Sequence, residues 1–246
     1  MKINNRPNYI GVLALAFAGM TWISCGETVE QEDGTAVVAE TEIQDEPVRR
    51  VRIETEFGDM VVELSNATPA HRDNFLELVE SGFYDGLLFH RVIDGFMIQG
   101  GDPNSRGADL AQPLGTGGPG YQIPAEIRSD HLHFKGALAA ARQGDAVNPD
   151  RQSSGSQFYL VQGRTFSKTE LLTIEARNFP PEGAKYSDES VERYATEGGT
   201  PFLDNQYTVF GHVVEGLSVI DSIASVETGA GNRPMEDVRM TMQVVE

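Results

Sequence analysis

The segment that most constrains the fold of this 246-residue chain is the run Phe89–Asp102, FHRVIDGFMIQGGD. It sets one cation among large apolar residues, follows it with a glutamine and closes on two glycines. Side chains alternate between the two faces of a strand, so their spacing decides which of them meet. A strand, a turn and a second strand would here present one mixed polar and apolar face, formed by Arg91, Phe96, Met97 and Gln99.

The neighbouring segments also favour short antiparallel strands. Residues 51–57 alternate apolar and polar side chains, and after a Gly-Asp turn residues 60–64 return as the second arm of a hairpin. Thr68 as N-cap and Pro69 as first residue predict a helix, which ends near Gly82. Short strands bounded by glycine and proline follow, so the predicted fold is mainly β, a closed antiparallel barrel with few helices.

Two later segments extend the pattern. Residues 155–160 read GSQFYL, and residues 202–211 read FLDNQYTVFG. Together with the first run, and in this order, they resemble the signature of the cyclophilins, peptidyl-prolyl cis-trans isomerases (rotamases) that assist protein folding. The resemblance covers about residues 50 to 246. It implies a closed eight-stranded antiparallel barrel capped by two helices, with a packed interior and the site on the outside face.

Isomerisation of an X–Pro bond needs no nucleophile, metal or cofactor, because no covalent bond is made or broken. The enzyme lowers a barrier of about 18–20 kcal/mol that amide resonance sets. An apolar pocket can grip the proline ring, and a donor can stabilise the prolyl nitrogen as its lone pair localises. A guanidinium suits the second task because it stays charged and presents rigidly placed donors.

The resemblance implies which residues form the site. Arg91 would be the catalytic donor, and Gln99 would orient it and contact the substrate. The substrate-binding residues would be Phe96, Met97, Ala141, Arg142, Gln143, Gln157, Tyr159, Phe202, Leu203 and Tyr207. Of these, the proline pocket would consist of Phe96, Met97, Tyr159 and Leu203, while Gln157 and the backbone of residues 141–143 would bind the peptide before the proline.

Four of these positions differ from residues that are common in the family. Tyr159 stands where many relatives have phenylalanine, and Arg142 replaces the asparagine of many eukaryotic members. Phe202 occupies the position of the tryptophan of cyclosporin-sensitive members, and Tyr207 that of a histidine. These departures would change ligand preference more than they change the catalytic arginine.

The N-terminus predicts a lipoprotein precursor. A positively charged start precedes an apolar run over residues 9–23, which is shorter than the roughly 20 residues of a membrane-spanning helix and suits a signal peptide over residues 1–24. Cys25, the only cysteine, follows and resembles the lipidated cysteine of a bacterial lipobox, although Trp22 replaces the usual aliphatic residue. The alternative, a free buried cysteine, fits poorly between an apolar run and an acidic tail.

Charge limits the partners of the chain. Residues 25–47 carry acidic side chains and no Lys or Arg, which predicts a flexible tether that serves the lipid anchor. Residues 48–246, the predicted isomerase domain, contain 17 basic and 29 acidic residues, a formal charge of −12. Such a surface argues against nucleic acid and against electrostatic attachment to anionic lipid. The resemblance implies proline-containing polypeptides as clients, and the lipobox-like Cys25 places the expected protein in the bacterial cell envelope, held to the membrane only by its lipid. We expect a monomer.

An insert interrupts the resemblance over about residues 163–200. Ser167 and Glu170 have the spacing of a capping box and predict a short helix, which Pro180-Pro181 and Gly183 end. Ser187 predicts the start of a second helix that extends to Thr196. The insert is either a flap that faces the substrate or a helical pair that packs on the barrel.

Two other patterns point to binding sites of other kinds. The glycine-rich residues 115–120 suggest a phosphate loop, but they lack the Lys-Ser/Thr of such a loop and match the loop that flanks the cyclophilin groove. His131 and His133 could bind a metal, but with no third ligand at a recognised spacing a turn with solvent-facing imidazoles fits better. We predict no metal site. The remaining alternatives for the whole chain are a proline-peptide-binding module or chaperone with little turnover, and a structural envelope lipoprotein.

Overall fold

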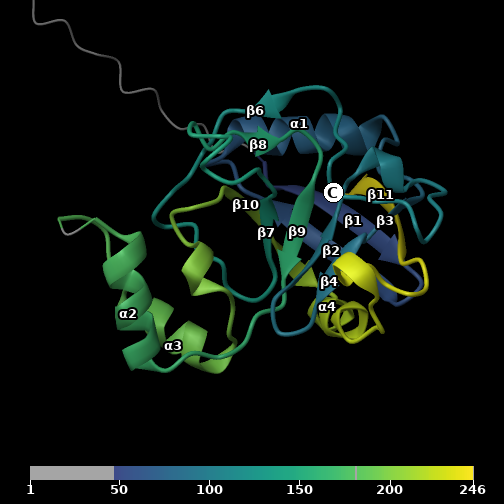
Figure 1. Cartoon of the computed structure of the whole chain (residues 1–246). Coiled ribbons are helices and arrows are strands. Elements are labelled where there is room, and N and C mark those ends of the chain that lie inside the picture. Colours follow the sequence, from purple (N-terminus) through teal and green to yellow (C-terminus); the bar gives the residue numbers. More distant parts are fainter. Residues whose placement is uncertain (1–46, 181, 246) are drawn as a thin grey trace, which may run out of the picture. The chain divides into compact units, whose positions relative to one another are not determined.

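A computed structural model describes residues 47–180 and 182–245 (Figure 1). The predicted signal peptide, Cys25 and all but the last residue of the predicted tether lie outside the described residues. Within the described part of the chain, none of the helices has the length and apolar character that crossing a membrane requires.

One antiparallel sheet of nine strands makes up most of the fold. Its strands are β1 (Arg49–Thr55), β2 (Gly58–Leu64), β3 (Leu87–Leu88), β4 (Arg91–Ile93), β5 (Met97–Gly100), β7 (Ala137–Ala140), β9 (Phe158–Val161), β10 (Val209–Glu215) and β11 (Arg239–Val245). Their order across the sheet is β3-β11-β1-β2-β10-β7-β9-β5-β4. The edge strands β3 and β4 are separated by only two residues, so the sheet curls until its edges lie close together. Strands β6 (Gln122–Ile123) and β8 (Ser153–Ser154) form a separate pair.

The predicted mainly β fold is confirmed, whereas the count of strands differs from the expected barrel. The sheet has nine strands where eight were expected. Closure of the barrel by hydrogen bonds between its two edges stays a prediction. The hairpin predicted after residue 50 is present, with Thr55 opposite Gly58 at its turn. Gly58 has a φ of +121°, which a residue with a side chain rarely adopts.

Alternation along the strands gives the sheet two faces with different neighbours. Ile98, Leu138 and Phe158 point into the main core, whose aromatic centre includes Phe75 on the first helix. The residues next to them along the same strands, which include Met97, Ala139 and Tyr159, form a smaller apolar cluster on the outer face. Because the inner face is packed, a peptide can reach the sheet only from outside.

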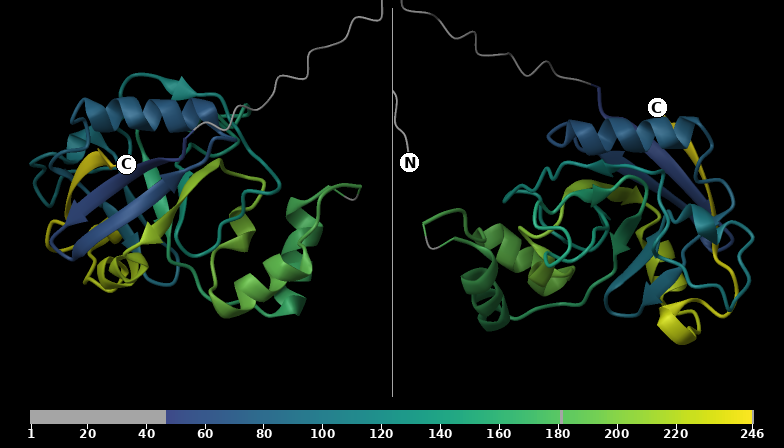
Figure 2. Two further views of the ribbon diagram at one scale, coloured as in Figure 1. Left: turned by 180° about the vertical axis from the view of Figure 1, so that it is seen from behind. Right: turned by 45° about the horizontal axis from the view of Figure 1, so that its top comes forward.

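Two helices lie at opposite ends of the curled sheet, α1 (Pro69–Glu80) and α4 (Leu217–Ala224) (Figures 1 and 2). Helix α1 starts at Pro69 as predicted, but the side chain of Thr68 does not cap it. Instead, the carboxylate of Glu126 accepts the main-chain N–H groups of Ala70 (3.1 Å) and His71 (3.0 Å). A carboxylate also suits the positive end of the helix dipole, which makes it a stronger partner there than a hydroxyl.

Two further helices, α2 (Lys168–Asn178) and α3 (Asp188–Thr196), form the predicted insert, and Figure 2 shows them to one side of the sheet. The capping box of Ser167 and Glu170 is present, and Ser187 accepts a hydrogen bond from the main chain at the start of α3. Both helices pack on a third apolar cluster built on Phe166, Leu171 and Tyr194. Short 3-10 helices complete the fold: η1 (Pro103–Ser105), η2 (Pro201–Leu203) and η3 (Ala230–Asn232).

Candidate functional site

A small cavity of about 120 Å³ opens on the outer face of the sheet. Its lining consists of nine residues that the sequence predicted for the site: Arg91, Phe96, Met97, Gln99, Ala141, Arg142, Tyr159, Leu203 and Tyr207. Gln143 and Gln157 line an adjoining groove, and Phe202 lies at the rim, with its ring centroid 5.6 Å from that of Phe96. The structure therefore brings together residues from four separate segments of the chain, 91–99, 141–143, 157–159 and 202–207.

The register of the strands explains why these side chains meet. Arg91 on β4 lies opposite Gln99 on β5, and Gln99 lies opposite Tyr159 on β9. Tyr159 in turn lies opposite Ala139 on β7. Residues that are directly opposite each other in a sheet share a face. The polar donors and the apolar floor thus stand side by side across four strands.

A chain of hydrogen bonds orients the guanidinium. Nη1 of Arg91 donates to Oε1 of Gln99 at 3.2 Å, and Nε2 of Gln99 donates to Oε1 of Gln157 at 3.1 Å. Nε2 of Gln157 then donates to the main-chain oxygen of Gly117 at 2.7 Å. None of the ion pairs among the described residues involves Arg91, which keeps donors of its guanidinium available to a ligand.

The glycine-rich loop lines the adjoining groove, which has a volume of about 610 Å³ and shares Gln99, Ala141 and Arg142 with the cavity. Main-chain N–H groups of Gly115 (2.5 Å) and Gly117 (3.2 Å) donate to the buried carboxylate of Asp102. A Cβ atom on Gly117 would lie 2.0 Å from that carboxylate, so only glycine fits there. Because an internal carboxylate takes the N–H groups of Gly115 and Gly117, these two donors are not available to a phosphate.

The backbone groups of Ala141 and Arg142 differ in whether they are free to bind a peptide in the groove. The N–H of Ala141 donates to Gln157 (2.9 Å) and its carbonyl accepts from Ser154 (2.8 Å), so both groups serve the fold. The side chain of Arg142 is only 4% exposed and donates to the carbonyl of Gln206, although the residue as a whole is half-buried. Its exposed surface is therefore mainly backbone, and neither its main-chain N–H nor its main-chain carbonyl bonds another described residue.

The prediction of solvent-facing imidazoles is wrong for His133, whose side chain is completely buried. Burial is tolerated because both ring nitrogens are satisfied: Nδ1 contacts Asp204 at 2.9 Å and Nε2 contacts the hydroxyl of Tyr159 at 3.0 Å. His131 contacts different partners, and no cluster of potential metal ligands occurs among the described residues. No local pattern in the sequence predicts this buried pair, because His133 and Asp204 are 71 residues apart.

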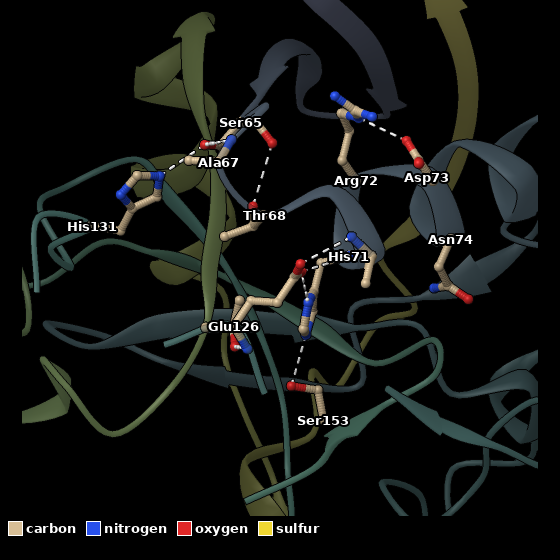
Figure 3. Close-up of polar contacts among 12 residues, drawn as sticks. Ser65, Ala67, Thr68, His71, Arg72, Asp73, Asn74, Glu126, His131 and Ser153 are labelled. Atoms are coloured by element: carbon tan, nitrogen blue, oxygen red, sulfur yellow. Dashed lines mark hydrogen bonds and ion pairs between the residues drawn. The ribbon is translucent and has the colours of Figure 1, made fainter. Parts of the chain in front are cut away.

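A second unpredicted polar cluster lies at the start of α1 (Figure 3). Nδ1 of His71 contacts Glu126 at 2.6 Å, and Nε2 contacts the hydroxyl of Ser153 at 2.9 Å. The order of groups is that of a hydrolase triad, but the serine is 1% exposed and the histidine 2%. No substrate reaches them, and the cluster joins α1 to β8.

Comparison with known proteins gives a consistent result. Residues 50–245 match the family model described as cyclophilin type peptidyl-prolyl cis-trans isomerase/CLD. A predicted peptidyl-prolyl cis-trans isomerase of Staphylococcus epidermidis is 35% identical over 198 residues, which cover 80% of this chain and 91% of that protein. A predicted bifunctional phosphatase/peptidyl-prolyl cis-trans isomerase of Streptococcus pyogenes is 40% identical over 199 residues, which cover 77% of this chain and only 37% of that protein.

Solved structures share the fold. A cyclophilin type isomerase of Cryptosporidium parvum superposes with a TM-score of 0.57 at 24% identity, and the match covers 81% of this chain and 99% of that one. The same protein, crystallised in the presence of the dipeptide Ala-Pro, superposes with a TM-score of 0.55. At this identity the likeness supports the architecture of the sheet and its helices.

Proposed function

This chain belongs to the cyclophilin-type peptidyl-prolyl cis-trans isomerases, and we propose that it binds the prolyl residue of its substrate in the cavity on the outer face. The observation that carries the proposal is the alignment of Arg91, Gln99 and Tyr159 on adjacent strands around that cavity. This alignment places the guanidinium donor of Arg91 beside the apolar floor of the cavity, and rotation of an X–Pro bond requires both. A cavity of about 120 Å³ suits one small ring, because pockets for drug-sized ligands are several times larger.

In the proposed mechanism the proline ring lies among Phe96, Met97 and Leu203, and Arg91 donates toward the prolyl nitrogen. As the bond twists, resonance is lost and a lone pair localises on that nitrogen. The guanidinium therefore stabilises the twisted amide more than the planar one, which is the condition for catalysis. Gln99 and Gln157 hold the guanidinium in place beforehand. About 1.4 kcal/mol of such preferential stabilisation gives a tenfold gain in rate.

The peptide that precedes the proline would lie in the groove beside the glycine-rich loop. The exposed backbone of Arg142 offers it one donor and one acceptor, as an extended peptide needs. Gln157 serves mainly to orient Gln99, because both its side-chain oxygen and its side-chain nitrogen already bond groups of the protein. Ala-Pro, the dipeptide present in the Cryptosporidium parvum crystals, is the minimal substrate of this kind.

The clients of this isomerase are proposed to be proteins of the bacterial cell envelope, because the N-terminal sequence resembles that of a lipoprotein precursor. Lipid on Cys25 would hold the domain to the membrane through the acidic tether. One acyl chain binds a membrane only marginally, so stable attachment needs several. Metabolic labelling with a palmitate analogue should mark the wild type and leave Cys25→Ser unlabelled. Equal labelling of both proteins would contradict the anchor.

Exchange NMR on an Ala-Pro peptide tests the function directly, because it measures binding and turnover in one sample. We expect catalysed cis–trans exchange at enzyme concentrations far below that of the peptide. Saturable binding without exchange would instead favour the alternative of a proline-peptide-binding module. Retention of Arg91, Gln99 and their supporting hydrogen bonds favours the enzyme, since a binding module needs only the apolar pocket.

A further inference from the structure

A buried carboxylate joins the insert to the candidate site. Asp204 has no exposed surface and follows Leu203, which is a wall of the cavity. It accepts hydrogen bonds from the main-chain N–H (2.8 Å) and Nδ1 (2.9 Å) of His133 and from the hydroxyls of Tyr186 (2.6 Å) and Tyr194 (2.7 Å). A buried carboxylate is tolerated only when donors surround it, so these groups fix one another.

His133 links Asp204 to Tyr159, which forms part of the floor of the cavity. Since Nδ1 donates to Asp204, Nε2 is an acceptor in the neutral imidazole. The hydroxyl of Tyr159 lies 3.0 Å from it, and the two rings are nearly parallel, with an interplanar angle of 11°. Burial raises the pKa of Tyr159 well above its ordinary value, so the hydroxyl keeps the proton that it donates. Tyr159 is thus the end of a chain that begins at Tyr194 on α3.

A second connection runs from the other helix of the insert. Asn178 is the last residue of α2, and its side-chain amide donates to the main-chain oxygens of Pro201 (3.4 Å), Phe202 (2.9 Å) and Asp204 (3.2 Å). These oxygens belong to η2 and the residue after it, on both sides of Leu203. Helix α2 therefore holds the loop that supplies the wall and the rim of the cavity.

We propose that the insert is a positioning element of the isomerase. Through Asp204 and His133 it fixes the ring of Tyr159, and through Asn178 it fixes Leu203, so that the cavity keeps the shape of a proline ring. This role differs from that of a flap over the substrate and from that of a helical pair without effect on the site. It rests on the proposed function, because it assumes that the cavity holds the proline.

A double-mutant cycle tests the proposal. We expect Tyr194→Phe and Tyr159→Phe each to lower kcat/KM about fivefold, the scale of one lost hydrogen bond, because each breaks the same chain. The double variant should also lose about fivefold, whereas independent effects would multiply to about twenty-five-fold. Tyr84→Phe is the matched control: it removes another buried tyrosine hydroxyl, bonded to the backbone of Ser156 at 3.1 Å, and should lower stability but not kcat/KM.

Asn178→Ala provides a second test that leaves the tyrosines intact. It should raise KM for an Ala-Pro peptide severalfold, because it releases the loop that carries Leu203, and thermal melts check that the variant is still folded. A folded Tyr194→Phe protein with wild-type kcat/KM, or a double variant with multiplied losses, would overturn the proposal. If the wild type itself fails to isomerise, the proposed function fails instead. The same cycle on peptide affinity, measured by NMR titration, then decides whether the insert positions the cavity.

Discussion

Two buried triads of the same chemistry occupy different parts of this fold. The helix-side triad consists of Glu126, His71 and Ser153, and the pocket-side triad of Asp204, His133 and Tyr159. In each, a carboxylate contacts Nδ1 of the histidine and a hydroxyl contacts Nε2. The first ends at a serine that is buried on β8, and the second at a tyrosine that lines the candidate site. We infer that such a triad acquires a functional role only from what its terminal hydroxyl group contacts.

The largest expected effect tests whether the cavity beside the pocket-side triad is the catalytic one. Arg91→Ala should remove about 2–4 kcal/mol of transition-state stabilisation, as loss of one preorganised donor does at other catalytic sites. Turnover should fall far more than peptide affinity, because the donor acts mainly on the twisted amide. Exchange NMR on an Ala-Pro peptide gives both quantities, and thermal melts exclude unfolding.

Arg91→Lys is the matched variant, because it retains the positive charge. It should recover little activity, since an ammonium does not reproduce the planar, bidentate geometry of the guanidinium. Phe96→Ala should weaken peptide binding as well, because it removes a wall of the cavity. A folded Arg91→Ala protein that isomerises at the wild-type rate would refute the mechanism and leave the binding module as the remaining interpretation.

Acid should unfold the protein through its buried histidines. Burial, the larger cause, lowers the pKa of His71 despite the opposing effect of Glu126, and it lowers the pKa of His90 to about 4. At pH 7 both groups are neutral in the folded chain and mostly neutral in the unfolded chain, where histidine has its ordinary pKa of about 6.5. As the pH falls below 6.5, the unfolded chain binds protons first, so stability decreases until the folded pKa is reached. For His90 the loss amounts to about 3 kcal/mol.

Urea unfolding between pH 7 and pH 4 measures this loss. His90→Gln removes one titrating group and should flatten the decline, whereas His212→Gln removes an exposed imidazole and should leave the decline as in the wild type. A wild-type free energy of unfolding that is constant over this range would contradict the expected contribution of both buried histidines.

One substitution in each triad tests whether only the pocket-side triad affects catalysis. Glu126→Gln weakens the bonds to His71 and to the start of α1, so the free energy of unfolding should fall by about 1–2 kcal/mol, the scale of a lost charged hydrogen bond. Its kcat/KM should stay at the wild-type value. Asp204→Asn should lower both stability and kcat/KM, because its triad ends in the cavity. Equal kinetic losses in the two variants would show that the triads do not differ in function.

Helices and strands of this fold could be predicted where neighbouring residues in the sequence specify them. The hairpin of residues 51–64 follows from alternation, and both insert helices follow from the capping residues Ser167 and Ser187. Local sequence predicts Thr68 as the cap of α1, because no local signal indicates the carboxylate of Glu126, which is 55 residues from His71. Predictions from sequence therefore succeed for elements that their own residues specify.

The roles of the site residues, and the later segments that complete the site, were predictable only through the resemblance. Spacing placed Arg91 and Gln99 on one face, and the strand register agrees with that. The burial of His133 could not be foreseen, because it depends on Asp204 and Tyr159 from two other segments. Such long-range polar pairs leave no periodic pattern, and these are the contacts through which the insert reaches the cavity.

The smallest expected effect concerns the rim of the cavity, where the resemblance implies that Phe202 takes the position of the tryptophan of cyclosporin-sensitive relatives. Phe202 is 46% exposed beside Phe96, and its ring lacks the N–H that an indole would donate to the drug. Phe202→Trp should tighten cyclosporin binding roughly tenfold, which corresponds to about 1.4 kcal/mol. Phe57→Trp, at a ring that is 39% exposed in the hairpin turn, is the matched control and should not change the Kd. Tight binding by the wild type, or no gain from Phe202→Trp, would mean that this loop does not correspond to the cyclosporin-binding loop of the family.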